Sequence, residues 1–268
     1  MSPILTALAR SARSTTLLLT FLGFPSVAAQ AQRLTPPDSA VGCRWQPECS
    51  APGASLRMEE VSRSGRGSGT EVVVSPRVSG LPRAVPFTFW MRQLEGPARW
   101  LATGYMLDSS GAVVCADSAQ HAALATKAGT GWCPAPLDKF ELTVGNAGEG
   151  EPFAYAFSTI DGGHSAFAVV VPRPVTATAA GCGTLDLQLL TRDGRAVRIL
   201  GSGFPPSSVL RTESKRGREA RPDQVTTDST GRFLAVVHGG GRGGEATYTV
   251  RTDRCEVALP YRWGRAAR

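Results

Sequence analysis

The chain has 268 residues, 42% of them hydrophobic, and a formal net charge of +7 at pH 7. This length exceeds the needs of one sandwich-sized domain and suits two. Only three of the 29 Lys and Arg residues are lysine, a composition typical of a GC-rich genome, so the basic charge does not by itself indicate a nucleic-acid partner, and we expect none.

The first 31 residues have the parts of a Sec-type signal peptide. Arg10 and Arg13 form a positive start, residues 15–24 form an uncharged apolar run, and Ala29-Gln30-Ala31 has the small-x-small pattern that signal peptidase requires. The run is shorter than the about 20 residues that cross a bilayer, so we expect no transmembrane segment. An N-terminal helix of the mature fold is the alternative. The pattern predicts cleavage after Ala31 and a secreted or periplasmic protein.

Six cysteines in an oxidising compartment are expected to form disulfides. Their order along the chain favours the pairs Cys43–Cys49, Cys115–Cys133 and Cys182–Cys255. A metal site is the weaker interpretation, because the sequence has no C-x-x-C pair and its histidines are scattered. We therefore predict no metal and no other cofactor.

Residues 32–55 contain four prolines and are expected to form a Pro-rich linker, and residues 62–69 an exposed loop. A first domain, 56–175, contains short apolar or β-branched runs bounded by Gly, Pro, Asp or Ser, a pattern that predicts β-strands. These runs are residues 72–74, 87–90, 100–107, 112–115, 140–144, 153–157 and 167–171. An Ala-rich patch at 119–128 is compatible with a helical turn.

A second domain, 176–268, has the same character. Leu185, Leu187 and Leu189 alternate with polar residues, as in a half-buried strand, and Asp193-Gly194 is the signal of a two-residue hairpin turn. Further strands are expected at residues 197–199, 209–212, 233–237, 247–250 and 257–259. Because no amphipathic helix pattern separates these strands, the sequence predicts an all-β fold of two tandem sandwiches with a boundary near 172–181.

A weak internal repeat relates the two domains. Ser79-Gly80-Leu81-Pro82 is matched 123 residues later by Ser202-Gly203-Phe204-Pro205, and Asp108-Ser109-Ser110-Gly111 is matched 120 residues later by Asp228-Ser229-Thr230-Gly231. Two landmarks in the same order favour two copies of one fold. The alternative is chance agreement, because Ser, Gly and Pro recur in the turns of any β protein.

The motifs of the second domain also resemble a known family. The segment from Gly201 to Val209, GSGFPPSSV, resembles the G-x-G-F-x-P-G-x-x-V signature of bacterial Ig-like modules in exported proteins, and Asp228-Ser229-Thr230-Gly231-Arg232-Phe233 resembles their D-x-x-G-x-F hairpin. Ser207 departs from the signature, where Gly is common. The resemblance implies two Ig-like β-sandwich domains after a cleaved signal peptide, and it leaves the function open, because sandwiches have many functions.

The charge is uneven along the chain. Residues 32–172 have a net charge of −2 and residues 173–268 a net charge of +7. The densest basic cluster, interrupted by two glutamates, consists of Lys215, Arg216, Arg218 and Arg221. We expect a solvated loop there, or alternatively an edge that binds anionic groups.

Three tryptophans of the first domain are candidates for stacking on sugars: Trp90, Trp100 and Trp132. Sandwich cores also need large apolar side chains, and Trp132 beside Cys133 fits packing on a disulfide equally well. Burial of all three would exclude a sugar platform.

Catalytic motifs are weak in this sequence. Gly163-His164-Ser165-Ala166 partly matches the G-x-S-x-G nucleophile motif, but Phe167 replaces the last Gly and an expected strand, not a helix, follows. The Gly-rich residues 239–244 also precede a strand and lack the ending of a phosphate-binding loop. Aspartates beside glycines are expected to form turns rather than calcium sites.

The sequence therefore predicts a protein that is not an enzyme. It favours a non-catalytic exported interaction module that presents its domains to a protein or cell-envelope partner. A carbohydrate-binding module that uses exposed tryptophans is the alternative.

Overall fold

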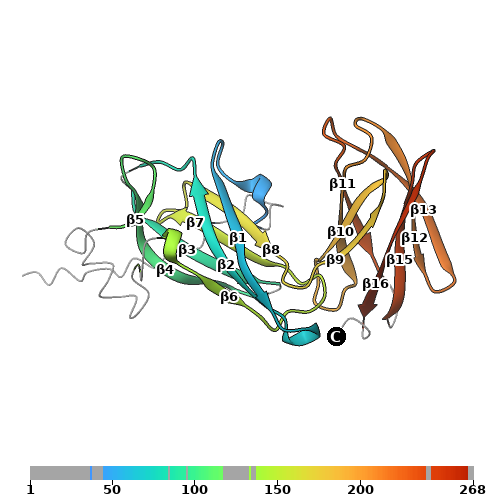
Figure 1. Cartoon of the computed structure of the whole chain (residues 1–268), viewed down its shortest axis with the longest axis horizontal. Helices are drawn as coiled ribbons and strands as arrows, with labels where there is room; N and C mark the ends of the chain where they lie inside the picture. The colour runs from blue at the N-terminus through green and yellow to red at the C-terminus, as the bar shows by residue number, and fades with distance from the viewer. Residues whose placement is uncertain are drawn as a thin grey trace, which may run out of the picture. The chain divides into compact units, whose positions relative to one another are not determined.

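The structure, a computed structural model, describes residue 37 and residues 45–83, 85–94, 96–116, 133, 137–239 and 243–264. These residues form an all-β protein whose four antiparallel sheets make two β-sandwiches in tandem along the chain (Figure 1). This confirms the predicted fold class. The predicted signal peptide, residues 1–31, and the Ala-rich patch at 119–128 lie outside the described residues.

The first sandwich packs a three-stranded sheet on a five-stranded sheet. The smaller sheet, in the order β1-β2-β6, consists of β1 (Ser55–Ser64), β2 (Glu71–Ser79) and β6 (Leu142–Val144). The larger sheet, in the order β5-β4-β3-β7-β8, consists of β3 (Phe87–Gln93), β4 (Ala98–Leu107), β5 (Val113–Cys115), β7 (Phe153–Thr159) and β8 (Ser165–Val170). Short 3-10 helices occur at Pro47–Cys49 (η1), Gly67–Gly69 (η2) and Leu137–Lys139 (η3).

Aromatic side chains fill the core between these two sheets. Because side chains alternate along a strand, Phe87 and Phe89 of β3 point to the same face. Phe87 stacks on Phe157 with ring centroids 4.9 Å apart, and Phe89 stacks on Tyr155 at 5.7 Å. All four rings are almost fully buried, so the apolar runs at 87–90 and 153–157 are core strands, as predicted.

Part of the predicted linker packs on the first sandwich. Trp45 is 2% exposed, lies 6.0 Å from the Phe167 ring between centroids, and donates its indole N–H to the Pro37 carbonyl. Ala51 donates its backbone N–H to the Ser165 carbonyl. Residues 45–51 therefore pack on one face of the larger sheet, and the limits of the Pro-rich linker, 32–55, stay a prediction.

The predicted exposed loop at 62–69 is also wrong in its first part, because Ser62, Arg63 and Ser64 pair with β2 as the end of β1. Most of β1 is exposed, so its sequence lacks the alternation of apolar and polar residues that marks a half-buried strand.

The second sandwich packs two four-stranded sheets. One sheet, in the order β14-β11-β10-β9, consists of β9 (Val175–Ala179), β10 (Gly183–Leu189), β11 (Ala196–Ser202) and β14 (Phe233–His238). The other, in the order β13-β12-β15-β16, consists of β12 (Val209–Arg216), β13 (Glu219–Thr226), β15 (Gly243–Arg251) and β16 (Glu256–Gly264).

The strands of this core follow the predicted alternation. Leu185, Leu187 and Leu189 point inward and meet Val250 and Leu259 of the facing sheet. The turn between β10 and β11 spans residues 190–195, so it is longer than the two-residue hairpin that Asp193-Gly194 predicted.

The domain limits 56–175 and 176–268 stay a prediction.

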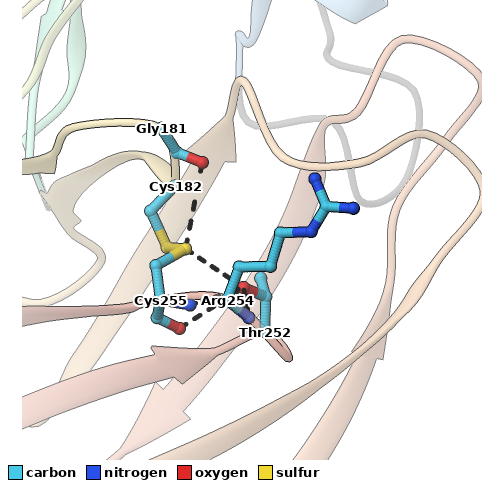
Figure 2. Close-up of a disulfide and its surroundings, with 5 residues drawn as sticks. All are labelled: Gly181, Cys182, Thr252, Arg254 and Cys255. Carbon is cyan, nitrogen blue, oxygen red and sulfur yellow. Dashed lines mark hydrogen bonds between the residues drawn. A yellow bond between two sulfur atoms is a disulfide. The ribbon is translucent and has the colours of Figure 1, made fainter.

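Two disulfides are described. Cys115 is bonded to Cys133, and Cys182 is bonded to Cys255. Figure 2 shows that the second bond links the residue just before β10 to the turn between β15 and β16, so it joins the two sheets of the second sandwich. Thr252 holds this turn by accepting the backbone N–H of Cys255 at 3.1 Å. Cys49 is also disulfide-bonded, but Cys43 lies outside the described residues, so that pairing stays a prediction.

The two sandwiches have the same order of strands. When β5 and β9 are set aside, each has seven strands, of which the first, second and fifth form one sheet and the fourth, third, sixth and seventh form the other. The repeated landmarks occupy equivalent places. Gly80 and Gly203 directly follow the second strand with φ of 73° and 74°, and Asp108 and Asp228 begin a turn after the fourth strand. This favours two copies of one fold over chance agreement.

Candidate functional site

The basic cluster lies on a β-hairpin, not in a solvated loop. β12 and β13 pair along their whole length, from Val209 opposite Thr226 to Arg216 opposite Glu219, and Gly217 and Arg218 form the turn. The loop prediction is therefore wrong. The prediction failed because β13 is exposed at almost every position, so its sequence lacks the apolar pattern that marks a strand.

One face of this hairpin points into the sandwich and is polar over most of its length. On β12, the inward positions recur every two residues and are Leu210, Thr212, Ser214 and Arg216. On β13, the residues opposite them are Val225, Asp223, Arg221 and Glu219. Only the first pair is apolar, whereas the inner faces of sandwich sheets are usually apolar throughout.

A cavity of about 350 Å³ lies against this polar face. It is bounded by the hairpin, by Tyr248 of β15 and by residues 235–238 of β14. Since its two sides are formed by β13 and β14, the outermost strands of the two facing sheets, we call it the β13–β14 groove.

Arg216 is the charged group held deepest in this region. Its guanidinium lies 5.3 Å from the Trp263 ring centroid and donates hydrogen bonds to the His238 carbonyl and, at 3.5 Å, to the Tyr261 hydroxyl. Its Nε is buried without a hydrogen-bond partner. In the part of the chain that the structure describes, no carboxylate lies within ion-pairing distance of Arg216.

Thr212 is a second unsatisfied group in the groove. Its side chain is 5% exposed, and its Oγ1 is buried without a well-formed hydrogen bond, with the Tyr248 hydroxyl close enough to interact with it. A buried hydroxyl without a partner costs free energy, typically about 1–3 kcal/mol. The polar lining of the groove is therefore not the one that stability alone would select.

An unpaired sheet edge borders the groove. β14 is the last strand of its sheet and pairs on one side only, with β11. In an antiparallel sheet, alternate residues of such a strand direct their N–H and C=O groups away from the neighbouring strand. Leu234 and Val236, on the outer face of β14, are 47% and 46% exposed.

The other predicted basic residues have different environments. Lys215 is exposed on the opposite face of β12, and Arg218 is exposed in the turn. Arg221 lines the groove and forms an ion pair of 2.6 Å with Glu219, with both side chains mostly exposed, so this pair contributes little stability. Of the three binding candidates in the cluster, the structure brings only Arg216 to the groove.

Two of the three tryptophan candidates lie among the described residues, and neither is fully exposed. Trp90 is 3% exposed and packs with Trp45 and Phe167, so the prediction that it presents a binding surface is wrong. Trp100, opposite Trp90 on β4, is partly buried against the same cluster. Trp132 lies outside the described residues. Large aromatic rings here contribute apolar packing, which is their usual role in sandwiches.

The segment Gly163-His164-Ser165-Ala166 runs from the end of a hairpin turn into β8. The Asp161 carboxylate accepts hydrogen bonds from Thr159 Oγ1 at 2.6 Å and from the Gly163 N–H at 3.0 Å, and these bonds lower the pKa of Asp161. Ser165 begins β8 and is buried, while His164 is exposed. Asp161 is thus a turn-forming residue, as expected of the aspartates beside glycines.

Three residues of the groove are not predicted by sequence patterns: Thr212, Ser214 and Tyr248. The signal was present in β12, where Leu210, Thr212 and Ser214 continue a two-residue period from apolar to polar. Tyr248 is placed opposite Ser214 only by the pairing of β12 with β15, which short-range patterns do not contain.

No helix among the described residues is long and apolar enough to cross a membrane. Searches of protein-family models and of curated proteins found no match to this chain.

The solved structures that match this chain do so at low similarity. The chicken interferon gamma receptor alpha chain is 9% identical with a TM-score of 0.23, and a two-domain fibronectin type-III segment of chicken tenascin is 11% identical with a TM-score of 0.21. Each covers 77% of this chain and 98% of the other. A BSP domain of a biofilm-associated protein is 12% identical with a TM-score of 0.23, covering 81% of this chain and 30% of the other. Similarity at this level carries no argument about function.

Proposed function

We propose that the chain is an exported, non-catalytic interaction module that binds a protein or cell-envelope partner at the β13–β14 groove of its second domain. The observation that carries the proposal is a polar cavity, with Thr212 Oγ1 and Arg216 Nε left without partners, beside an open sheet edge. A domain that served only as a spacer would be more stable with apolar residues at these inward positions.

Two features support export as part of this proposal. The first 31 residues have the pattern of a signal peptide. The described disulfides are bonds that form and persist in oxidising compartments. We place the working protein in the periplasm or outside the cell on this basis.

We also propose that the second domain belongs with the exported Ig-like modules of the G-x-G-F-x-P type. The support is that several motif residues have structural roles. Gly203 has a positive φ of 74°, and Phe204 is buried and packs on Phe233, with ring centroids 5.4 Å apart. Gly201 lies under the Phe233 ring, so the two motifs meet in one place.

Binding of the purified mature chain to two anionic probes tests the proposed function. The probes are immobilised polyglutamate and lipopolysaccharide micelles. We expect at least one to bind, with an affinity that falls as salt is raised, because exposed charges are screened. We also expect Arg216→Gln to weaken that binding. No binding to either probe, or binding that Arg216→Gln leaves unchanged, would contradict a partner site in the groove.

A further inference from the structure

We infer that the partner bound at the β13–β14 groove is an extended protein segment that adds to β14 as a new strand and places an acidic side chain on Arg216. The inference rests on the proposed function and names the chemical class of the partner. It follows from three properties of the groove: its backbone edge, its alternating side-chain environment and its unpaired cation.

The backbone edge of β14 is the first property. A strand with one neighbour presents N–H and C=O groups to the other side, and an extended peptide satisfies these groups by continuing the sheet. Residues 235–238 of β14 line the cavity, so the cavity reaches this edge, where the His238 carbonyl already accepts a hydrogen bond from Arg216. The 350 Å³ available accommodates the inward side chains of a short segment.

The two sides of the added strand would meet different surfaces. Its side chains alternate, as in any strand, between the groove and the outer face of the sheet. The outer side chains would lie beside Leu234 and Val236, which are exposed and apolar. The inner side chains would meet Thr212, Ser214 and Tyr248, which are polar. The site therefore selects a segment in which apolar residues alternate with polar ones.

The unpaired Arg216 favours an acidic inner side chain. Of the charged residues that line the groove, Arg221 and Glu219 form an ion pair with each other. Arg216 has no carboxylate partner among the described residues, and its guanidinium is partly buried. A carboxylate beside such a group forms charge-assisted hydrogen bonds that are stronger than those between neutral groups.

A polyanionic glycan fits the same groove less well. Glu219 and Asp223 line it together with Arg216 and Arg221. A chain with sulfate on every unit would place like charges beside these two carboxylates, and this repulsion costs free energy. A peptide places one carboxylate at one register position and neutral side chains at the others.

The test uses three labelled peptides and the mature chain, with binding followed by fluorescence anisotropy. In the first peptide, valine alternates with threonine and a single central glutamate replaces one threonine. The second has glutamine in place of the glutamate, and the third has methylated backbone nitrogens on the edge that would face β14. We expect the first peptide to bind, the second to bind about tenfold more weakly, and the third not to bind.

Two neighbouring residues of β12 provide a matched pair of variants. Arg216→Gln removes the cation in the groove and should weaken binding of the glutamate peptide about tenfold. Lys215→Gln removes the same charge from the opposite face and should change binding less than twofold. Because Arg216 also contacts Trp263 and His238, the conservative Thr212→Val variant provides a second test that leaves those contacts intact. It should weaken binding by a few fold.

Amide hydrogen exchange gives the direct structural readout. Strand addition should slow exchange at alternate residues of β14 when the glutamate peptide is bound. Binding without this protection would overturn strand addition while binding at the groove stands. Displacement of the peptide by heparin, with the same dependence on Arg216, would do the same. Equal effects of Lys215→Gln and Arg216→Gln would overturn both proposals, because the binding would then not be at the groove. Failure of the peptides together with failure of polyglutamate and lipopolysaccharide would overturn both proposals.

Discussion

Ser207 shows how a single residue departs from a motif without changing its geometry. Its φ is 49°, in the left-handed region that favours glycine, and its N–H donates to the Asp228 carbonyl at 2.9 Å. The turn of the motif is therefore kept, at the cost of backbone strain.

Replacing this serine by glycine should stabilise the second domain. The Ser207→Gly change relieves the clash of Cβ in the left-handed conformation, and we expect the free energy of unfolding to rise by about 0.5–1 kcal/mol. Urea denaturation measures it. Ser208→Gly is the matched control, because the Ser208 hydroxyl donates to the Pro206 carbonyl and its loss should lower stability. Stabilisation by both changes would contradict the assignment of strain to Ser207.

Asp228 gives a prediction about pH. Its carboxylate accepts hydrogen bonds from the N–H of Arg232 at 2.9 Å and from the hydroxyl and N–H of Thr230, each at 2.8 Å, and these bonds lower its pKa. A carboxylate with a lowered pKa stabilises the fold above its unfolded pKa, about 3.9, and loses that effect as pH falls through the folded pKa. Asp228→Asn should therefore destabilise the protein at pH 7, by an amount that shrinks below about pH 4.

The measurement is urea denaturation at pH 7, 5, 4 and 3. Asp253→Asn is the control, because no hydrogen bond to its carboxylate occurs among the residues described, and its effect should be small at every pH. A difference between wild type and Asp228→Asn that stays constant down to pH 3 would contradict the role of the charged form.

At the scale of elements, the pairing of β11 with β14 explains why two distant motifs occur together. Gly201 lies directly opposite Phe233, and a Cβ on Gly201 would lie 2.0 Å from the Phe233 ring. The Phe204 N–H donates to the Gly231 carbonyl at 3.2 Å. The G-x-G-F segment and the D-x-x-G-x-F segment thus fit together as one packing unit between neighbouring strands.

Gly201→Ala should therefore destabilise the second sandwich. The added methyl group forces the Phe233 ring or the strands to move, which typically costs about 1–3 kcal/mol. Gly69→Ala is the matched control, because a Cβ there meets nothing within 4 Å and the backbone is not left-handed. We expect that change to be neutral or slightly stabilising. Thermal unfolding of the two variants measures the difference, and equal melting temperatures would show that Gly201 does not need to be glycine.

The elements also show which strands sequence patterns predict. Strands that face a core, such as β7 and β10, have apolar runs or alternation and were expected at nearly their observed positions. β1 and β13 are mostly exposed, so nothing in their composition distinguishes them from loops. Their pairing with β2 and β12 decides their conformation instead.

The candidate site was predictable only in part for the same reason. Arg216 belonged to a visible basic cluster, but its position against Trp263 and beside β14 depends on contacts between residues far apart in the sequence. Trp90 illustrates the opposite case. A tryptophan on a strand is compatible with either face, and the burial of the outer face by Trp45 came from a segment that resembled a linker.

At the scale of the whole molecule, the Cys182–Cys255 bond is the main covalent constraint on the second sandwich. It closes a sequence separation of 73 residues and joins the two sheets. In the chain-entropy model a loop of this length corresponds to about 4 kcal/mol of stability. The double change Cys182→Ser and Cys255→Ser should therefore destabilise the second domain by a few kcal/mol.

Hydrogen exchange separates this effect by domain. Amides of β12 and β15 should exchange faster in the double variant, while those of β3 and β7 in the first sandwich act as the internal control and should be unchanged. Equal acceleration in both sets would mean that the two sandwiches unfold as a single unit.

The order of the described disulfides has a consequence for how the chain matures. Each bond joins two cysteines that follow one another along the chain, Cys115 with Cys133 and then Cys182 with Cys255. A chain that emerges from its N-terminus can therefore oxidise the first pair before Cys182 appears, and Cys182 then waits as a lone thiol until most of its domain has followed. Native pairing along this route requires only an oxidant acting in sequence, with no later exchange of partners.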